Sequence, residues 1–201
     1  MARRAFDFAA AAVGVLLLWP VFALIALAIA ATSRGPVLFM QERVGRHGAP
    51  FRIMKFRTMR PDAERLGGPL TVAGDTRITR VGAFLRATKL DELPQLLNVL
   101  RGDMAIVGPR PEVPRYVAMY DREQRRVLEV RPGITDPASI HYRDESTLLA
   151  AAEDPEATYV REVMPHKLAL NLAYMERRTL WSDVGVIFAT LVRLFRRSPE
   201  P

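Results

Sequence analysis

A chain of 201 residues is long enough for one domain with its own core, and the absence of cysteine excludes disulfides, thiolate metal sites and a cysteine nucleophile. With 29 basic and 22 acidic residues the formal charge is +7, which suits an anionic partner such as nucleic acid, membrane headgroups or a phosphorylated substrate. Arginine supplies nearly all of this charge, so either two-pronged phosphate contacts or an arginine-rich genome composition explains it.

The first long segment, Phe8–Ser33, carries no charged side chain and is predicted to enter a membrane. Its apolar part is longer than the core of about 7–15 residues that is usual in a signal peptide, and no convincing cleavage site follows it. As one straight helix, Phe8–Ala31 would measure about 36 Å, which is enough to cross a hydrocarbon core of about 30 Å. Length alone therefore permits a full span.

Pro20 lies at the middle of this segment, where proline removes a backbone hydrogen bond and bends a helix. Basic residues flank both ends, with Arg3 and Arg4 before the segment and Arg34 and Arg43 after it, and the positive-inside rule places both flanks in the cytoplasm. We therefore predict a re-entrant helix over residues 1–34 that enters and leaves the same face. A kinked, tilted span is the alternative.

The remaining residues, 35–201, are predicted to form one compact body. Two strands, Pro36–Glu42 and Phe51–Met59, flank a turn-prone stretch and form a hairpin. Helices are predicted at Val81–Arg86, Glu92–Leu100, Val113–Tyr120, Arg122–Glu129, Ser146–Ala152, Ala157–Val163 and His166–Arg177. The predicted fold class is α+β, dominated by helices, with a small sheet.

The last helix starts near Trp181. Its apolar residues recur at helical spacing, and Arg193, Arg196 and Arg197 lie on its opposite side. Such an amphipathic helix lies either in the membrane interface or against the core of the body, and periodicity does not decide between these.

The candidate chemistry centres on Asp91 and Glu92. Pro94 is tolerated only in the first turn of a helix, so we expect a helix to begin near Leu90 or Asp91 and end by Gly102. Free amides and the helix dipole would then keep the Asp91 carboxylate ionised. An ionised aspartate can attack phosphorus and form an acyl phosphate, although two neighbouring carboxylates are more often an ordinary solvated helix start.

Such a transfer requires charge neutralisation. Arg86, Arg110 and the region of Arg57 are candidates to bind a diphosphate, and Mg²⁺ could bridge its oxygens. Glu92 could bind the metal or manage a proton. His47, His141 and His166 lack the spacing of a helical zinc pair, and His141-Tyr142-Arg143 is expected to form a surface strand or to border the substrate pocket.

Four ordered motifs carry a resemblance to a known family: Lys55-Phe56-Arg57-Thr58-Met59, Thr88-Lys89-Leu90-Asp91-Glu92-Leu93-Pro94-Gln95, Gly108-Pro109-Arg110-Pro111-Glu112 and Arg131-Pro132-Gly133-Ile134-Thr135. From Arg4 almost to the chain end, the sequence resembles the bacterial sugar transferases, the monotopic phosphoglycosyl transferases. The length is similar to that of small members that consist of the catalytic unit alone.

This resemblance implies a monotopic enzyme on the cytoplasmic face of the inner membrane, in contact with phospholipid through amphipathic helices. It implies that Asp91 takes a sugar phosphate from a UDP-sugar, releases UMP and passes the group to polyprenyl (undecaprenyl) phosphate, which starts a lipid-linked glycan such as an exopolysaccharide. It implies Mg²⁺ with Asp91 as a ligand, catalytic roles for Asp91 and Glu92, and substrate binding by Lys55, Arg57, Arg86, Arg110 and Glu112.

Two positions depart from the family pattern: Trp19 precedes Pro20 where many relatives have a small polar residue, and Asp136-Pro137 follows Thr135 where larger relatives read glycine and a glutamine-valine pair. The second departure leaves the transferred sugar undetermined. The sequence also leaves open whether two copies form a homodimer.

Two other functional classes remain as alternatives. A membrane-anchored basic scaffold without catalysis is the first. Nucleic-acid binding is the second, and the sequence lacks both a recognition-helix pattern and an aromatic platform for it.

Overall fold

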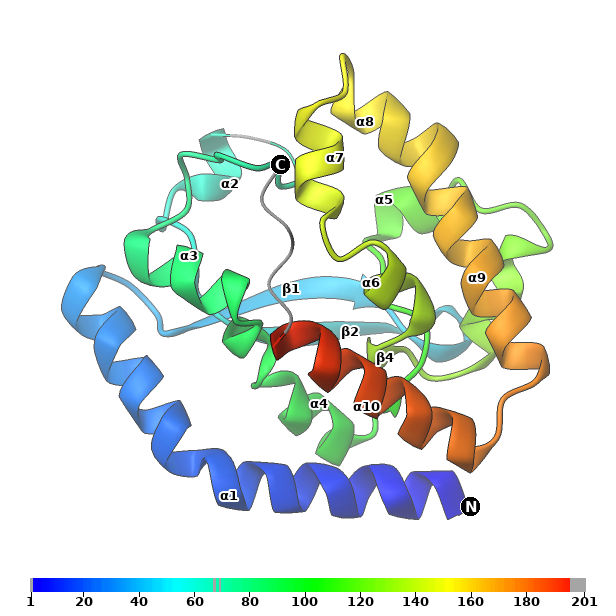
Figure 1. The fold of residues 1–201 in the computed structure, drawn as a ribbon. Helices are drawn as coiled ribbons and strands as arrows, with labels where there is room; N and C mark the ends of the chain where they lie inside the picture. The colour runs from blue at the N-terminus through cyan, green and yellow to red at the C-terminus, as the bar shows by residue number, and fades with distance from the viewer. Residues whose placement is uncertain (1, 67, 69, 196–201) are drawn as a thin grey trace.

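The computed structural model describes residues 2–195, except 67 and 69. Its first element is α1 (Ala2–Thr32), a 31-residue helix that contains Pro20 and bends near its middle, as Figure 1 shows. A helix-interior proline causes such a bend because it removes one hydrogen bond and crowds the preceding turn. The outer face of α1 exposes seven large apolar side chains: Phe8, Val13, Leu16, Leu17, Trp19, Leu24 and Leu27. The helix is long and apolar enough to cross a membrane.

The inner face of α1 packs along the body of the protein on both sides of the bend. Ala11 is buried in a cluster with Val99 of α4 (Gln95–Arg101), and Gly14 brings the helix backbone close to Leu96. Beyond the bend, Ile25 and Ile29 are buried with Phe56 and Leu85. Helix α1 therefore lies against the body along most of its length instead of projecting from it (Figure 1).

The predicted hairpin is confirmed. Strands β1 (Leu38–Val44) and β2 (Pro50–Phe56) pair antiparallel, with Leu38 opposite Phe56 and Val44 opposite Pro50, around the short helix η1 (Arg46–Gly48). His47 adopts a left-handed conformation in this turn, with φ of 58°. The helix-dominated α+β class is confirmed as well.

A second sheet was not predicted. Strands β3 (Ala105–Val107) and β4 (Gly133–Thr135) form a parallel pair in which Ala105 lies opposite Gly133. Gly108 and Gly133 approach so closely that a Cβ on Gly133 would lie 2.1 Å from the Gly108 nitrogen. This contact joins the Gly-Pro-Arg-Pro-Glu segment to the Arg-Pro-Gly-Ile-Thr segment.

The body has further helices at α2 (Ala63–Leu66), α3 (Arg80–Ala87), α5 (Pro114–Val117), α6 (Pro137–His141), α7 (Glu145–Ala150), α8 (Pro155–Thr158), α9 (Met164–Glu176) and α10 (Leu180–Phe195), with 3₁₀ turns at η2 (Leu90–Glu92) and η3 (Gln124–Glu129) and a π-helical segment at η4 (Tyr159–Val163). The main core lies between α5, η3, η4 and α9, where Tyr116, Val127, Val163 and Leu168 are buried together.

Several sequence predictions need correction. The helix expected at Val113–Tyr120 is the single turn α5, although Val113, Tyr116 and Tyr120 are all buried in the core. The helix expected at Arg122–Glu129 is the 3₁₀ segment η3. The helix expected at Ala157–Val163 is divided between α8 and η4. No strand forms at His141-Tyr142-Arg143, because Asp136 caps α6 and the helix runs to His141.

The C-terminal helix α10 exposes four of its periodic apolar residues, while Ile187 and Val192 are half-buried. Trp181 is 83% exposed and Phe188 is 68% exposed, and Val184 and Leu191 are exposed too. In Figure 1, α10 lies above the first half of α1, and its N-terminal part is joined to α1 by the Arg3–Asp183 ion pair. Packing of this face against the core is therefore excluded for these four residues, which favours the interfacial alternative. Arg196 and Arg197 lie outside the described residues, as do the side chains of Leu194 and Phe195.

Candidate active site

Asp91 lies in the tight turn η2, directly before α4. Lys89 adopts a left-handed conformation, with φ of 57°, and this reversal starts the 3₁₀ turn. Pro94 then occupies the N-cap position of α4, so the helix proper begins only at Gln95. A helical turn begins at Leu90 as predicted, but it is 3₁₀, so Asp91 lies about one turn before the N-terminus of the α-helix and not at it.

The expected stabilisation of the Asp91 carboxylate by helix amides is also wrong. The side chain is buried, and its Oδ1 has no hydrogen-bond partner within the described part of the chain. Burial raises the pKa of Asp91, and the neighbouring Glu92 adds to this, against the opposing effect of Lys55, Lys89 and Arg86. The carboxylate is a poorly solvated group with a free oxygen.

Glu92 has the opposite environment. Its Oε1 accepts a hydrogen bond from Lys55 Nζ at 2.9 Å, and Arg110 donates to both of its oxygens, to Oε2 at 3.2 Å. Burial alone would raise the pKa of Glu92, but Arg110 and Lys55 outweigh it and hold that pKa well below its usual range. Two adjacent carboxylates therefore have oppositely shifted pKa values.

The two cations that contact Glu92 come from separate elements. Lys55 projects from β2, and burial lowers the pKa of its ammonium from 10.5 to about 8. Arg110 follows β3 between Pro109 and Pro111, and the Glu92 carboxylate raises its pKa. The side chain of Arg110 is 30% exposed, so part of the guanidinium still faces solvent.

Arg86 reaches the site from α3, which Thr79 caps by accepting a hydrogen bond from Gly82 N. The Arg86 Nε donates to Thr58 Oγ1 at 2.9 Å, and neither terminal nitrogen has a hydrogen-bond partner among the described residues. Burial lowers the pKa of Arg86, and the negative charge of Asp91 opposes this. A nearby, positioned guanidinium with free terminal nitrogens suits an incoming phosphate.

Two residues that were predicted to bind substrate, Arg57 and Glu112, are hydrogen-bonded to other parts of the protein. Arg57 is buried and donates to the carbonyls of Ser33 and Arg34, both at 2.7 Å, at the end of α1. Glu112 accepts hydrogen bonds from Arg43, from the Val113 amide and from Tyr159. Substrate binding by Arg57 and Glu112 stays a sequence prediction. In the structure, both side chains make their hydrogen bonds to other residues of the protein.

No group of three or more histidine, aspartate or glutamate side chains that could hold a metal occurs among the described residues. Mg²⁺ commonly binds one or two carboxylates together with substrate phosphates, so it does not require such a group. The free Oδ1 of Asp91 fits that mode, whereas both oxygens of Glu92 are engaged by cations.

Sequence reasoning missed three contributors to the site. Thr58 holds Arg86, and Arg43 and Tyr159 hold Glu112. Thr58 belongs to the motif Lys55-Phe56-Arg57-Thr58-Met59, which is a signal that could identify it. Arg43 and Tyr159 are separated by more than one hundred positions and carried no motif.

A family model described as bacterial sugar transferase matches residues 1–197. The chain belongs to the bacterial sugar transferase family. All the site residues described above lie within the matched region, from Arg43 to Tyr159. The family resemblance predicted from the motifs is thereby confirmed.

Curated relatives in this family match nearly the whole chain. UDP-N-acetylgalactosamine-undecaprenyl-phosphate N-acetylgalactosaminephosphotransferase of Aeromonas hydrophila is 37% identical over 94% of this chain and 42% of its own length. UDP-glucose:undecaprenyl-phosphate glucose-1-phosphate transferases of Caulobacter vibrioides and Escherichia coli are 38% and 36% identical, each over 96% of this chain. The chain spans 69% of the Caulobacter protein and 40% of the Escherichia coli protein.

Proposed function

We propose that this member of the family transfers a sugar 1-phosphate from a UDP-sugar to undecaprenyl phosphate. The observation that carries the proposal is the contrast between Asp91, buried with a free oxygen, and Glu92, ion-paired with Lys55 and Arg110. The names of the relatives support the substrate classes, since each refers to transfer of a sugar phosphate to undecaprenyl phosphate. The structure supports a reaction that needs one nucleophile and several cations.

In the first step an oxygen of Asp91 attacks the phosphorus that bears the sugar, and the bond from that phosphorus to the bridging oxygen of UMP breaks. This forms an aspartyl phosphosugar and releases UMP with the bonding electron pair. Poor solvation makes the carboxylate oxygen more reactive, while Arg86 and the exposed part of Arg110 neutralise the diphosphate. Mg²⁺, held by Asp91 and phosphate oxygens, would supply further charge neutralisation at this point.

In the second step a phosphate oxygen of undecaprenyl phosphate attacks the same phosphorus. The acyl phosphate bond breaks, Asp91 is restored as a carboxylate, and undecaprenyl diphosphosugar leaves. The same cations serve both steps because both transition states place negative charge on the oxygens of one phosphorus. Ion pairing by Glu92 fixes Lys55 and Arg110 in place throughout.

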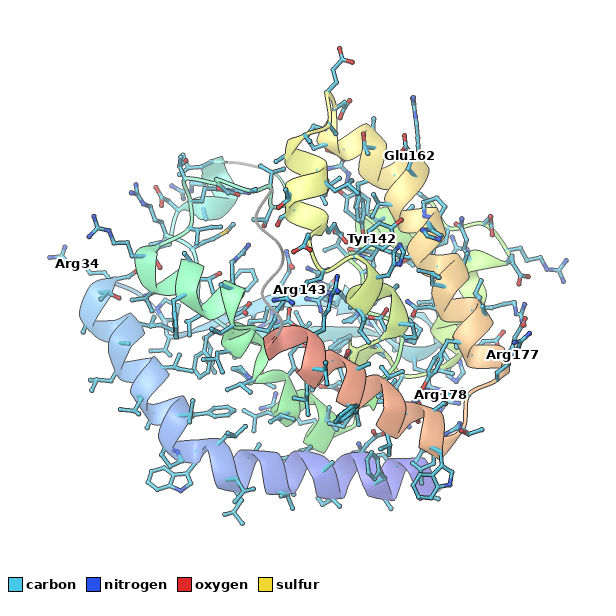
Figure 2. The ribbon with its side chains drawn as sticks, in the orientation of Figure 1. Arg34, Tyr142, Arg143, Glu162, Arg177 and Arg178 are labelled. Carbon is cyan, nitrogen blue, oxygen red and sulfur yellow. The ribbon has the colours of Figure 1, made fainter. Side chains whose placement is uncertain are left out.

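The same structure supports a re-entrant course of α1 and a cytoplasm-facing body. At its first turn, Arg4 donates to the carbonyls of Val99 and Leu100 at 2.6 and 3.1 Å. At its other end, Arg57 donates to the carbonyls of Ser33 and Arg34. Both ends are thus attached to one polar body, and Figure 2 shows Arg34 at the far end of the bent helix. A helix that crossed the bilayer would separate its ends by the hydrocarbon core.

The topology has a direct test because the chain contains no cysteine. Ala2→Cys and Arg34→Cys introduce single thiols at exposed positions on either side of the segment. Arg34 is preferred to Gly35, whose φ of +107° and closeness to Arg57 leave no room for a side chain. Labelling of both thiols from the cytoplasmic side is expected, and labelling from opposite sides would rule out the re-entrant course.

The chemistry is tested by incubating the detergent-solubilised protein with a panel of UDP-sugars and measuring UMP release with and without undecaprenyl phosphate. We expect release with at least one donor, and a mass increase equal to a sugar phosphate on the peptide containing Asp91 when the acceptor is left out. Asp91→Asn should abolish both signals. Full UMP release by this variant would refute the nucleophile assignment and favour a different reaction path.

A further inference from the structure

Glu112, two residues after Arg110 in the sequence, is the centre of a group of hydrogen-bonded side chains. Its Oε1 accepts from Arg43 Nη1 at 3.2 Å and from the Val113 amide at 2.8 Å, and its Oε2 accepts from the Tyr159 hydroxyl. Its backbone carbonyl accepts from the Val44 amide at 3.0 Å. Every one of these contacts fixes the residue that lies two positions after Arg110.

Arg43 adds a second set of contacts to the same loop. Besides Glu112, its Nη1 donates to the Pro111 carbonyl at 3.1 Å, and its Nη2 donates to Gln41 Oε1 at 2.6 Å. Burial lowers the pKa of Arg43, which Glu112 opposes. Because Glu112 neutralises Arg43, the neighbouring Arg110 remains paired with Glu92 instead of being displaced by repulsion between two guanidinium groups.

Tyr159 comes from a different part of the chain and is buried, with 3% of its surface exposed. Its ring centroid lies 5.1 Å from the ring centroid of Tyr116 and 5.5 Å from Lys167 Nζ. It is also the first residue of the π-helical segment η4. Such segments cost backbone energy and occur frequently at functional sites, so a role for the side chain that this one places is expected.

We propose that Tyr159 is a positioning residue for Arg110, acting through Glu112 and Arg43, so that the guanidinium stays aligned with Glu92 and the donor diphosphate. The part that concerns the diphosphate rests on the function proposed above. Within this arrangement Glu112 orients the loop Pro109-Arg110-Pro111 and does not bind substrate itself. The hydroxyl of Tyr159 matters, whereas the ring serves the core.

Tyr159→Phe removes only the hydroxyl and keeps the ring contacts. We expect UDP affinity, measured by calorimetry, and kcat/KM for the UDP-sugar each to fall roughly tenfold to hundredfold, as for loss of one charge-assisted hydrogen bond. In an Arg110→Ala background the same change should have almost no further effect, because its target is gone. A purely structural role would give the same loss in both backgrounds.

Tyr116→Phe is the matched control. The Tyr116 hydroxyl is buried beside Tyr159 and has no hydrogen-bond partner in the described part of the chain, so its removal should change UDP affinity by less than about twofold. Thermal unfolding of each variant checks that the fold is retained. Equal UDP affinity of wild type and Tyr159→Phe, or additive losses with Arg110→Ala, would overturn the positioning role. Coupled UDP binding without UMP release by the wild type would overturn only the transferase proposal.

Discussion

The contrast between the two adjacent carboxylates predicts opposite stability effects for two nearly isosteric substitutions. Glu92→Gln leaves Lys55 and Arg110 without their counter-ion, and the loss of one partner of a buried ion pair costs about 3–5 kcal/mol. Because the pKa of Lys55 is already about 8, this lysine can lose its proton and limit the loss. We therefore expect Glu92→Gln to lower the free energy of unfolding by about 3 kcal/mol, which lowers Tm by roughly 6–12 °C for a chain of this size.

Asp91→Asn has the reverse effect on stability. It replaces a charge that burial disfavours, so the folded state should gain about 1–2 kcal/mol and Tm should rise by roughly 2–8 °C at pH 7. UMP release should nevertheless fall at least about a thousandfold, because the nucleophile is lost. Circular dichroism melts in detergent and the UMP assay measure the two effects on the same samples.

Melts in which Glu92→Gln is as stable as the wild type, or in which Asp91→Asn is less stable than Glu92→Gln, would refute the assigned environments of the two carboxylates. Either result would mean that Asp91, and not Glu92, compensates Lys55 and Arg110. The assignment of the nucleophile would then have to be exchanged between the two residues.

Further predictions concern pH, the end of α1 and α10. UMP release should decline above about pH 8 as Lys55 loses its proton, and Lys55→Arg should move this decline to higher pH. The fold should persist at that pH, because the pKa of Lys55 is below 10.5 in the folded state and its deprotonation therefore favours folding. Arg57→Met should speed trypsin cleavage after the exposed Arg34 without a matching effect of Arg86→Met, and equal cleavage rates would contradict the role of Arg57 at the end of α1. In a Trp19→Phe variant, brominated phospholipid should quench Trp181, and unquenched fluorescence would place α10 away from the bilayer.

The parts of the fold that could be predicted from the sequence depend on short-range patterns. The apolar run around Pro20 and the turn between the two strands are each contained in a few consecutive residues, and both predictions were close to the structure. The β3–β4 pair could not be predicted, because each strand has three residues and their pairing depends on contact between Gly108 and Gly133. The π-helical segment η4 was not predicted either, since Ala157–Val163 was expected to be one regular helix.

In the site, the motifs identified the right segments but not the partners of each side chain. Lys55, Asp91, Glu92 and Arg110 do converge, yet Arg57 from the same motif as Lys55 turns toward the end of α1. A strand alternates its side chains between two faces, but Arg57 lies just past β2, where this alternation no longer applies. Tertiary contacts therefore decide which arginine is available for the proposed phosphate contact, and the terminal nitrogens of Arg86 are better placed for it than those of Arg57.

The reactivity proposed for Asp91 depends on the contacts of the neighbouring Glu92 with the two cations. Glu92 engages both Lys55 and Arg110, so Asp91 is buried beside positive charge without a hydrogen bond to Oδ1. If the lysine or the arginine paired with Asp91 instead, its carboxylate would be more stable and a weaker nucleophile. Environments that shift the pKa values of adjacent acids in opposite directions suit them to different roles, which in the proposed mechanism are the attacking group and the counter-ion. The proposed positioning of Arg110 by Tyr159, through Glu112 and Arg43, serves the same end. Asp91 stays without an ion-pair partner only while Arg110 remains paired with Glu92.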